Sequence, residues 1–343
     1  MTAANTQCRL AGRPMGLPSS ADWSIIEEPV PSAGDGQFVV EIDYLSIDPA
    51  MRTWMNAGRS YVPPVEIGEV MRGLAVGRVV ESRHPDFAVG DHVSGLLGVQ
   101  NYAVSDGAGV AKIDTSLAPA STYLAALGIS GLTAYFGLLD IGRLAPGQTV
   151  LVSGAAGSVG NIVGQIAKIH GCRAIGIAGG EPKCRWLIER AGFDAAIDYK
   201  TADLRAELRT HAPGGVDVFF DNVGGAALEA ALNRLAQGAR IVLCGAVSQY
   251  NQAPRGPANY MQLLVARASM TGFVVFDFST RYPEAVAQLG NWIRTGRLRS
   301  HEQIERGTVG DFPEALEKLF AGQNTGKLIL ALNDPPSHQA PSR

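Results

Sequence analysis

The second half of the chain alternates between short apolar runs and segments long enough to form a helix. The runs are rich in Val, Ile, Leu and Ala with few polar interruptions, a pattern typical of strands buried on both faces of a parallel sheet. They read TVLVSG from Thr149, then CRAIGIAG, AAIDY, VDVFFDN, RIVLCG and SMTGFVVF. Crossover helices are expected between them, at residues 159–170, 183–191, 202–210, 226–235 and 283–295. The pattern predicts a doubly wound α/β domain.

A different pattern precedes this domain. Between residues 37 and 104, apolar and polar residues alternate in short runs, and Gly and Pro fall between the runs. A period of two with frequent turns predicts a small β-rich unit, a partly closed barrel. The segment 121–144 then has the apolar spacing of a helix.

The end of the chain supplies two further elements. A helix is expected at 312–320, followed by a strand at GKLILAL. The residues after Asn333 are rich in Pro, Ser and Gln, and we expect them to be disordered. The domains that we infer are a β-rich one at 1–128, completed by 311–343, and an α/β one at 129–310.

Composition narrows the class of protein. The chain has 343 residues, 46% hydrophobic and 18% charged, with a formal net charge of −3. This balance argues against nucleic acid or an anionic membrane surface as the main partner. The first residues lack the apolar core of a secretory signal, and no run is long enough to span a membrane. The four cysteines are scattered without a CxxC pair, so we expect a cytoplasmic protein with free thiols.

The most informative segment is TVLVSGAAGSVGNIVGQIAKIHGC. Gly154, Gly157 and Gly160 form a GxxGxxG turn between a predicted strand and a predicted helix. Small residues at these positions let the backbone approach a pyrophosphate, and the helix N-terminus supplies N–H groups and a positive dipole end. We infer a dinucleotide-binding loop.

The residues about 20 positions further on favour NADPH over NADH. In NAD-specific sites an acidic side chain there binds the ribose hydroxyls, but this chain has Ala178, Gly179 and Gly180. Lys183 and Arg185 follow, and cations are what a 2′-phosphate requires. Glu181 is the one acidic residue nearby that could approach a ribose.

With these residues in place, the chain resembles the zinc-independent branch of the medium-chain dehydrogenase/reductase superfamily. This branch holds leukotriene B4 dehydrogenase/prostaglandin reductases, plant double-bond reductases and curcumin-reductase-like enzymes. The resemblance extends over residues 37–332. The motifs that carry it are LSIDPAMR, SYVPPVEIGEVMRG, GISGLTAYFGL, the glycine loop, FDNVGG, CGAVSQYN and GFVV. It implies a GroES-like β-rich catalytic domain, a Rossmann-type NADPH domain and a homodimer.

The resemblance also implies a set of site residues. Pyrophosphate contacts would come from Gly157, Ser158, Val159 and Gly160, and 2′-phosphate contacts from Lys183 and Tyr199, with Asn324 nearby. The rest of the cofactor would lie along Asn222, the segment Cys244, Gly245, Ala246, Val247, Ser248, Gln249 and Tyr250, and the segment Phe273, Val274 and Val275. Relatives commonly carry Tyr where this chain has Ala50, so the wall of the substrate pocket is expected to differ here.

We expect no metal. A catalytic zinc needs three protein ligands and an open position. The β-rich region contains His84 and His92 but no cysteine between residues 37 and 104 to join them, and the remaining histidines lack ligand spacing.

Without zinc, hydride transfer to an activated alkene is the reaction that we favour. Negative charge then collects on the carbonyl oxygen as an enolate, which a positioned hydroxyl can stabilise. Tyr250 is our candidate for that hydroxyl, and Tyr61 is the alternative. Tyr250 could instead pack on the cofactor and bind ribose, and water or a ribose hydroxyl could deliver the proton.

Three functions stay open from the sequence. The first is NADPH-dependent reduction of α,β-unsaturated ketones and aldehydes. The second is a quinone reductase or a zinc-free alcohol dehydrogenase. The third is a non-catalytic NADPH-binding sensor, which would bind cofactor but oxidise it with no acceptor.

Overall fold

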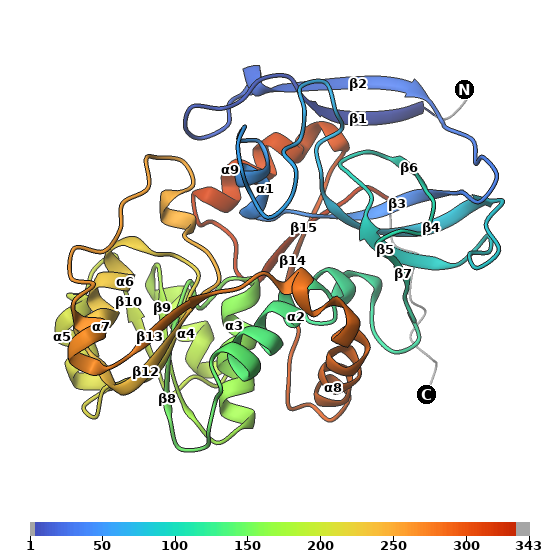
Figure 1. Ribbon diagram of the computed structural model, residues 1–343. Coiled ribbons are helices and arrows are strands. Elements are labelled where there is room, and N and C mark those ends of the chain that lie inside the picture. Colours follow the sequence, from blue (N-terminus) through green and yellow to red (C-terminus); the bar gives the residue numbers. More distant parts are fainter. Residues whose placement is uncertain (1–3, 334–343) are drawn as a thin grey trace. The chain divides into compact units, whose positions relative to one another are not determined.

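The computed structural model describes residues 4–333 (Figure 1). Contacts divide the chain into two compact units, one made of the residues up to Leu124 and those from Glu302 on, the other of Ala125–His301. We expected the domain boundaries at 128/129 and 310/311. The disorder expected after Asn333 concerns residues outside the described part. Within residues 4–333, each helix is too short or too polar to cross a membrane.

The second unit is built on a parallel sheet, as the apolar runs predicted. Its strands follow the order β10-β9-β8-β11-β12-β13, and each neighbouring pair is parallel. The strands are β8 (Thr149–Ser153), β9 (Arg173–Ala178), β10 (Ala195–Asp198), β11 (Val216–Asp221), β12 (Leu235–Leu243) and β13 (Ser269–Gly272). This order reverses direction between β8 and β11. The loops after these two strands therefore leave the same edge of the sheet at the point where doubly wound folds bind ligands.

Helices connect these strands, since each crossover between parallel strands needs a segment long enough to return along the sheet. The connecting helices are α3 (Ser158–Ile169), α4 (Glu181–Glu189), α5 (Leu204–His211), α6 (Gly225–Leu232) and α7 (Gln262–Ala266), while α2 (Ile129–Phe136) precedes β8 and α8 (Tyr282–Arg294) follows β13. The core between sheet and helices includes Leu151, Ile175 and Phe219, all without solvent exposure. The doubly wound fold class is confirmed.

Two predicted elements of this unit differ in detail. The helix expected over 121–144 is divided into a 3₁₀ helix at Ala120–Leu124, α2, and a π turn at Gly137–Ile141. The division arises because Gly128, before α2, is extended with ψ −159°. The strand expected through SMTGFVVF ends at Gly272, because its partner β12 ends at Leu243, the residue paired with Gly272. A 3₁₀ helix at Val275–Arg281 follows.

The first unit contains an antiparallel sheet with one parallel edge pair. Its strands run in the order β14-β15-β3-β4-β5-β7, and β6 pairs with β3. They are β3 (Phe38–Ser46), β4 (Leu74–Ser82), β5 (His92–Leu96), β6 (Tyr102–Ser105), β7 (Val110–Lys112), β14 (Glu302–Arg306) and β15 (Lys327–Ala331). Helices α1 (Ala50–Trp54) and α9 (Phe312–Phe320) belong to the same unit. The predicted β-rich unit is confirmed, with strands from both ends of the chain.

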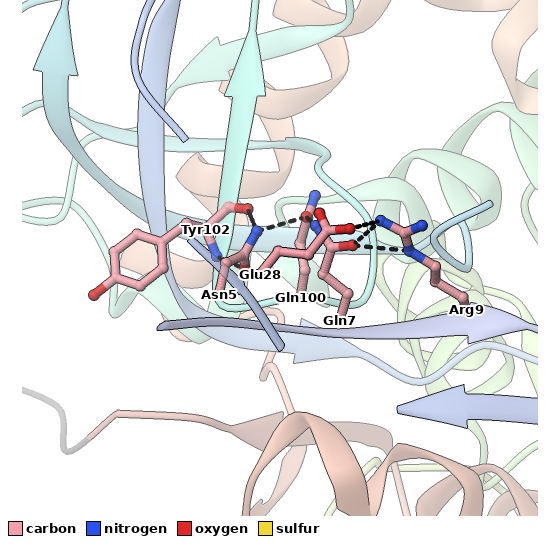
Figure 2. Close-up of polar contacts among 6 residues, drawn as sticks. All are labelled: Asn5, Gln7, Arg9, Glu28, Gln100 and Tyr102. Carbon is pink, nitrogen blue, oxygen red and sulfur yellow. Dashed lines mark hydrogen bonds and ion pairs between the residues drawn. The ribbon is translucent and has the colours of Figure 1, made fainter. Parts of the chain in front are cut away.

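A hairpin near the N-terminus lacks the pattern from which we predicted the other strands. It consists of β1 (Ala4–Leu10) and β2 (Trp23–Pro29). Asn5 and Gln7 are buried polar residues on β1, and Figure 2 shows how they are satisfied. Asn5 exchanges hydrogen bonds with the backbone of Tyr102, and Gln7 donates to Gln100 at 3.0 Å. Polar side chains that bond each other replace the apolar face here, so hydrophobic periodicity could not find the strand.

A buried ion pair joins the last strand to the LSIDPAMR motif. Lys327 on β15 is 2% exposed, and its Nζ lies 2.5 Å from Asp48 Oδ1 and donates to Ile47 O at 3.0 Å. A buried ammonium is tolerated only with such partners. The pair fixes the segment before α1 to a strand 279 residues away in sequence.

Candidate functional site

The glycine loop occupies the turn between β8 and α3. Gly154 has φ +56°, in the left-handed region that favours glycine. A Cβ atom on Gly160 would lie 2.4 Å from the carbonyl oxygen of Gly154, so only glycine lets α3 begin this close to its own strand. The turn thus forms a cradle of backbone at the N-terminus of a 12-residue helix. Exposed N–H groups and a helix dipole there suit a phosphate group.

The other residues of the loop are held by α2 and by the start of α3. Ser158 donates from its hydroxyl to that of Ser130 at 2.7 Å. Asn161 donates to the carbonyl oxygen of Gly157 at 2.6 Å. Val159 is half-buried in the first turn of α3. Ser130 comes from the GISGLTAYFGL motif, so the structure brings this motif to the glycine loop, a contact that sequence spacing could not reveal.

The loops after β8 and β11 are joined through a buried carboxylate. Asp221 is fully buried, and its Oδ1 accepts hydrogen bonds from the Ser153 hydroxyl at 2.6 Å and from the backbone N–H groups of Val223 and Gly224 at 3.0 Å. Asn222 in turn donates to Ser153 O at 2.7 Å. Burial raises the pKa of Asp221. This side chain fixes the end of each strand at the switch point, and we had not singled it out from FDNVGG.

The segment after β12 pairs with the same loop. Backbone N–H groups of Gly245, Val247 and Ser248 donate to the carbonyl oxygens of Asp221, Asn222 and Val223, at 3.1, 3.1 and 3.2 Å. That set of contacts brings together the FDNVGG and CGAVSQYN motifs. They line one edge of the sheet, although 22 residues separate Asp221 from Cys244.

Cys244 and Tyr250 are the two residues of this segment that we considered for a chemical role. Burial, reinforced by Asp221, raises the pKa of Cys244 to about 12, so this thiol stays protonated and is a packing group rather than a nucleophile. Tyr250 turns back on its own loop, where its hydroxyl oxygen accepts a hydrogen bond from Ala246 N–H at 3.2 Å. Gln249 accepts from the N–H of Arg255 at 2.7 Å, which closes the turn.

A group of basic residues lies where β9 and β10 end. Tyr199 and Lys200 follow β10 directly, and both approach Gly179, which follows β9. A Cβ atom on Gly179 would lie 3.0 Å from Tyr199 Oη and 3.1 Å from Lys200 Cε. Lys183 stands in the first turn of α4, and burial together with Lys200 lowers its pKa. The structure therefore brings Lys183 and Tyr199 to one edge, and adds Lys200.

Arg185, the other cation considered from the sequence, faces a different partner. It forms an ion pair with Glu181 one helical turn earlier. Glu181 is the first residue of α4, and its side chain is 77% exposed.

The remaining predicted residues lie elsewhere. Phe273 packs edge-on to Phe220 at 6.4 Å between ring centroids, and Val274 and Val275 lead into the following 3₁₀ helix, where Val275 is buried. Asn324 and Tyr61 belong to the first unit. Asn324 is buried and donates to Gly326 O at 2.9 Å, and Tyr61 accepts from the Trp54 indole at 3.0 Å.

Residues 4–333 lack a cluster of metal-ligating side chains. No group of three or more His, Cys, Asp or Glu side chains in that part of the chain could hold an ion. His92 begins β5.

Comparison with known proteins gives consistent matches over the whole chain. Residues 6–113 match the family described as the N-terminal domain of oxidoreductase, and residues 158–291 match the family described as zinc-binding dehydrogenase. A putative NADP-dependent oxidoreductase of Bacillus subtilis is 44% identical, with 98% of this chain and all of that protein covered. The NADPH-dependent curcumin reductase of Escherichia coli is 40% identical, with 95% and 96% covered. The crystal structure of CurA from Vibrio vulnificus in complex with NADPH is 40% identical, with a TM-score of 0.91 over 96% of this chain and all of that one.

Proposed function

Because the chain belongs to the zinc-independent branch of the medium-chain dehydrogenases/reductases, we propose that it uses NADPH to reduce the carbon–carbon double bond of α,β-unsaturated ketones and aldehydes. The observation that carries this proposal is the joining of the loops after β8, β11 and β12 at the switch point of the sheet. That edge offers a backbone cradle, a polar loop and a tyrosine hydroxyl in one unit. The curcumin reductase at 40% identity supports the substrate class, because curcumin is itself a conjugated enone.

The residues present fit NADPH. Gly157, Ser158, Val159 and Gly160 would hold the pyrophosphate, since they form the backbone turn at the N-terminus of α3. Lys183 and Tyr199 would hold the 2′-phosphate. Asn222, the segment 244–250 and the segment 273–275 would border the rest of the cofactor. When bound, NADPH supplies the hydride for the β-carbon of the substrate.

Tyr250 is our candidate for the group that stabilises the enolate oxygen. Its hydroxyl oxygen accepts a hydrogen bond from Ala246 N–H at 3.2 Å, which places the hydroxyl at the loop that follows β12. A donor placed where negative charge develops lowers the barrier more than it strengthens substrate binding. Protonation of the α-carbon then completes the reaction. Tyr61 stays the alternative donor.

The reaction class is tested by following NADPH absorbance with purified protein and 3-alken-2-ones, 2-alkenals, quinones and saturated ketones, each repeated with NADH. We expect oxidation of NADPH with the enones, a saturated ketone as product, and slower oxidation of NADH. Consumption only with quinones would replace the proposal with a quinone reductase. Tight NADPH binding with no acceptor active would favour the sensor.

Tyr250 is tested by Tyr250→Phe, which removes only the hydroxyl. We expect kcat on an enone to fall about 10²-fold, the scale at which loss of one oxyanion donor acts, with little change in the Kd for NADPH. The matched control is Tyr260→Phe, since Tyr260 is 59% exposed beyond this loop. Tyr61→Phe is measured beside them. An unchanged kcat for Tyr250→Phe would remove Tyr250 from the mechanism, and a loss confined to Tyr61→Phe would transfer the role.

We also propose a homodimer, the assembly that the resemblance implies. β13 is the last strand of its sheet, and α7 beside β12 carries the exposed apolar side chains of Leu264 and Val265, 68% and 65% exposed. An edge strand next to an apolar patch suits antiparallel pairing with a second copy. Light scattering after size exclusion tests this, and Leu264→Asp with Val265→Asp should give a monomer if the patch is the interface.

A further inference from the structure

The ends of β9 and β10 place an acidic residue where the sequence showed none. Ala178 is the last residue of β9, and its register partner on β10 is Asp198. The position after β9 is where an acid would favour NADH. In sequence Asp198 stands 20 residues further on, so only the pairing of the strands brings it there. A preference for NADPH must therefore be explained in the presence of this carboxylate.

The carboxylate of Asp198 is directed into the backbone. Its Oδ1 accepts from Gly180 N–H at 2.8 Å and from Lys200 N–H at 3.0 Å, and its Oδ2 accepts from the Thr201 hydroxyl at 3.2 Å. These bonds, with the one from Gly180 first, lower the pKa of Asp198, so it is ionised at neutral pH. One side chain thus ties the turn before α4 to the turn after β10.

The same bonds hold together the two segments that carry Lys183 and Lys200. Gly180 is the N-cap of α4, so fixing Gly180 fixes the helical turn that carries Lys183. Lys200 is bound to Asp198 through its N–H, and its side-chain Cε approaches Gly179. Burial and, after it, the charge of Lys200 lower the pKa of Lys183. Two cations that repel each other favour a dianion between them.

We propose that Lys200 is a second cation for the 2′-phosphate of NADPH and that Asp198 is the positioning residue that holds it there. The inference deepens the proposed function and rests on it for the identity of the cofactor. Preference for NADPH then depends on Lys183 and Lys200 together, while the bonds of Asp198 to the backbone keep its charge from opposing the phosphate.

The experiment measures binding without hydride transfer, so that it does not depend on the reaction. The probes are adenosine 2′,5′-bisphosphate and 5′-AMP, titrated calorimetrically into the full chain. For Lys200→Gln we expect binding of the bisphosphate to weaken about tenfold, as for the loss of one charge-assisted contact, with 5′-AMP unchanged. Lys200→Arg should restore most of the affinity. Arg209→Gln on exposed α5 is the control for a lost positive charge.

Asp198 is tested by a double-mutant cycle. Asp198→Ala should weaken the bisphosphate, and combining it with Lys200→Gln should add little, because both act through one side chain. Tighter bisphosphate binding by Asp198→Ala would overturn the positioning role. Equal losses for both probes in Lys200→Gln, or none, would overturn the role of Lys200.

The two proposals fail separately. If enones are not reduced but the bisphosphate and 5′-AMP respond as expected, the reaction is wrong and the inference stands. If the unaltered protein does not distinguish the two probes, the NADPH proposal and this inference both fall.

Discussion

The glycine loop after β8 and the lysine cluster after β9 and β10 are neighbours on one sheet, yet they are built in opposite ways. The first is backbone, with no room for a Cβ on Gly160. The second is made of side chains, with Tyr199 and Lys200 beside Gly179 and Lys183 in the first turn of α4. The pyrophosphate that NADH and NADPH share can be bound by backbone N–H groups. The 2′-phosphate is present in NADPH and absent from NADH, so its recognition needs charged side chains, which a substitution can remove.

The largest expected effect tests the backbone cradle. In Gly160→Ala the new Cβ would lie 2.4 Å from Gly154 O, so either the loop or α3 must shift. We expect a loss of about 1–3 kcal/mol of folding stability, as for overpacking, and loss of binding for NADPH and NADH alike. Thermal denaturation and cofactor titration measure the two. Gly214→Ala is the control, since a Cβ there meets nothing within 4 Å. Equal behaviour of the two variants would contradict the cradle.

The next effect tests the cluster. Lys183→Gln should weaken NADPH binding by about 10- to 100-fold, the range for a charged hydrogen bond of about 1.5–3 kcal/mol, and leave NADH binding nearly unchanged. Such selectivity would distinguish Lys183 from Gly160, because Gly160→Ala is expected to weaken the binding of NADPH and NADH alike. If NADH binding falls equally, Lys183 supports the fold rather than the phosphate.

The pH dependence sharpens the same point. Burial and Lys200 lower the pKa of Lys183 below its ordinary 10.5. In the cofactor-free protein this side chain therefore loses its proton at a lower pH than an ordinary lysine does. A bound phosphate favours the protonated form, so binding takes up a proton. We expect the ratio of NADPH to NADH affinity to fall as the pH rises from about 8, where the 2′-phosphate is already a dianion, toward the ordinary lysine pKa of 10.5, and to fall less in Lys183→Gln. A flat ratio over that range would contradict a lysine that senses the phosphate.

The smallest effect comes from a side chain within the cradle. Ser158→Ala removes one hydroxyl that bonds Ser130 at 2.7 Å. Its backbone N–H stays, so we expect a loss of about 0.5–1.5 kcal/mol in folding stability and only a few-fold change in NADPH binding. Chemical denaturation and titration check both. A loss as large as that of Gly160→Ala would show that the cradle recognises phosphate through side chains.

The fold could be predicted wherever burial produces a regular pattern of apolar and polar residues in the sequence. The strands β8 to β12 are continuous apolar runs because both faces are covered, and they were found from that pattern. Strand β1 was not predicted, because Asn5 and Gln7 occupy two of its buried positions. Their side chains hydrogen-bond to Gln100 and Tyr102 instead of packing against apolar residues. The strand expected through Phe273 to Phe276 has the right composition but no partner strand beyond Leu243.

By itself the sequence determined the doubly wound fold and the glycine loop, and it predicted Lys183 as a cation for the 2′-phosphate, because spacing along one chain segment encodes each of them. Only the tertiary structure decided which segments meet. It placed Asp198 beside Ala178, Lys200 beside Gly179, and the loop of Cys244 against that of Asp221. These juxtapositions depend on the order of strands in the sheet, and strand order is set by packing between elements far apart in the chain.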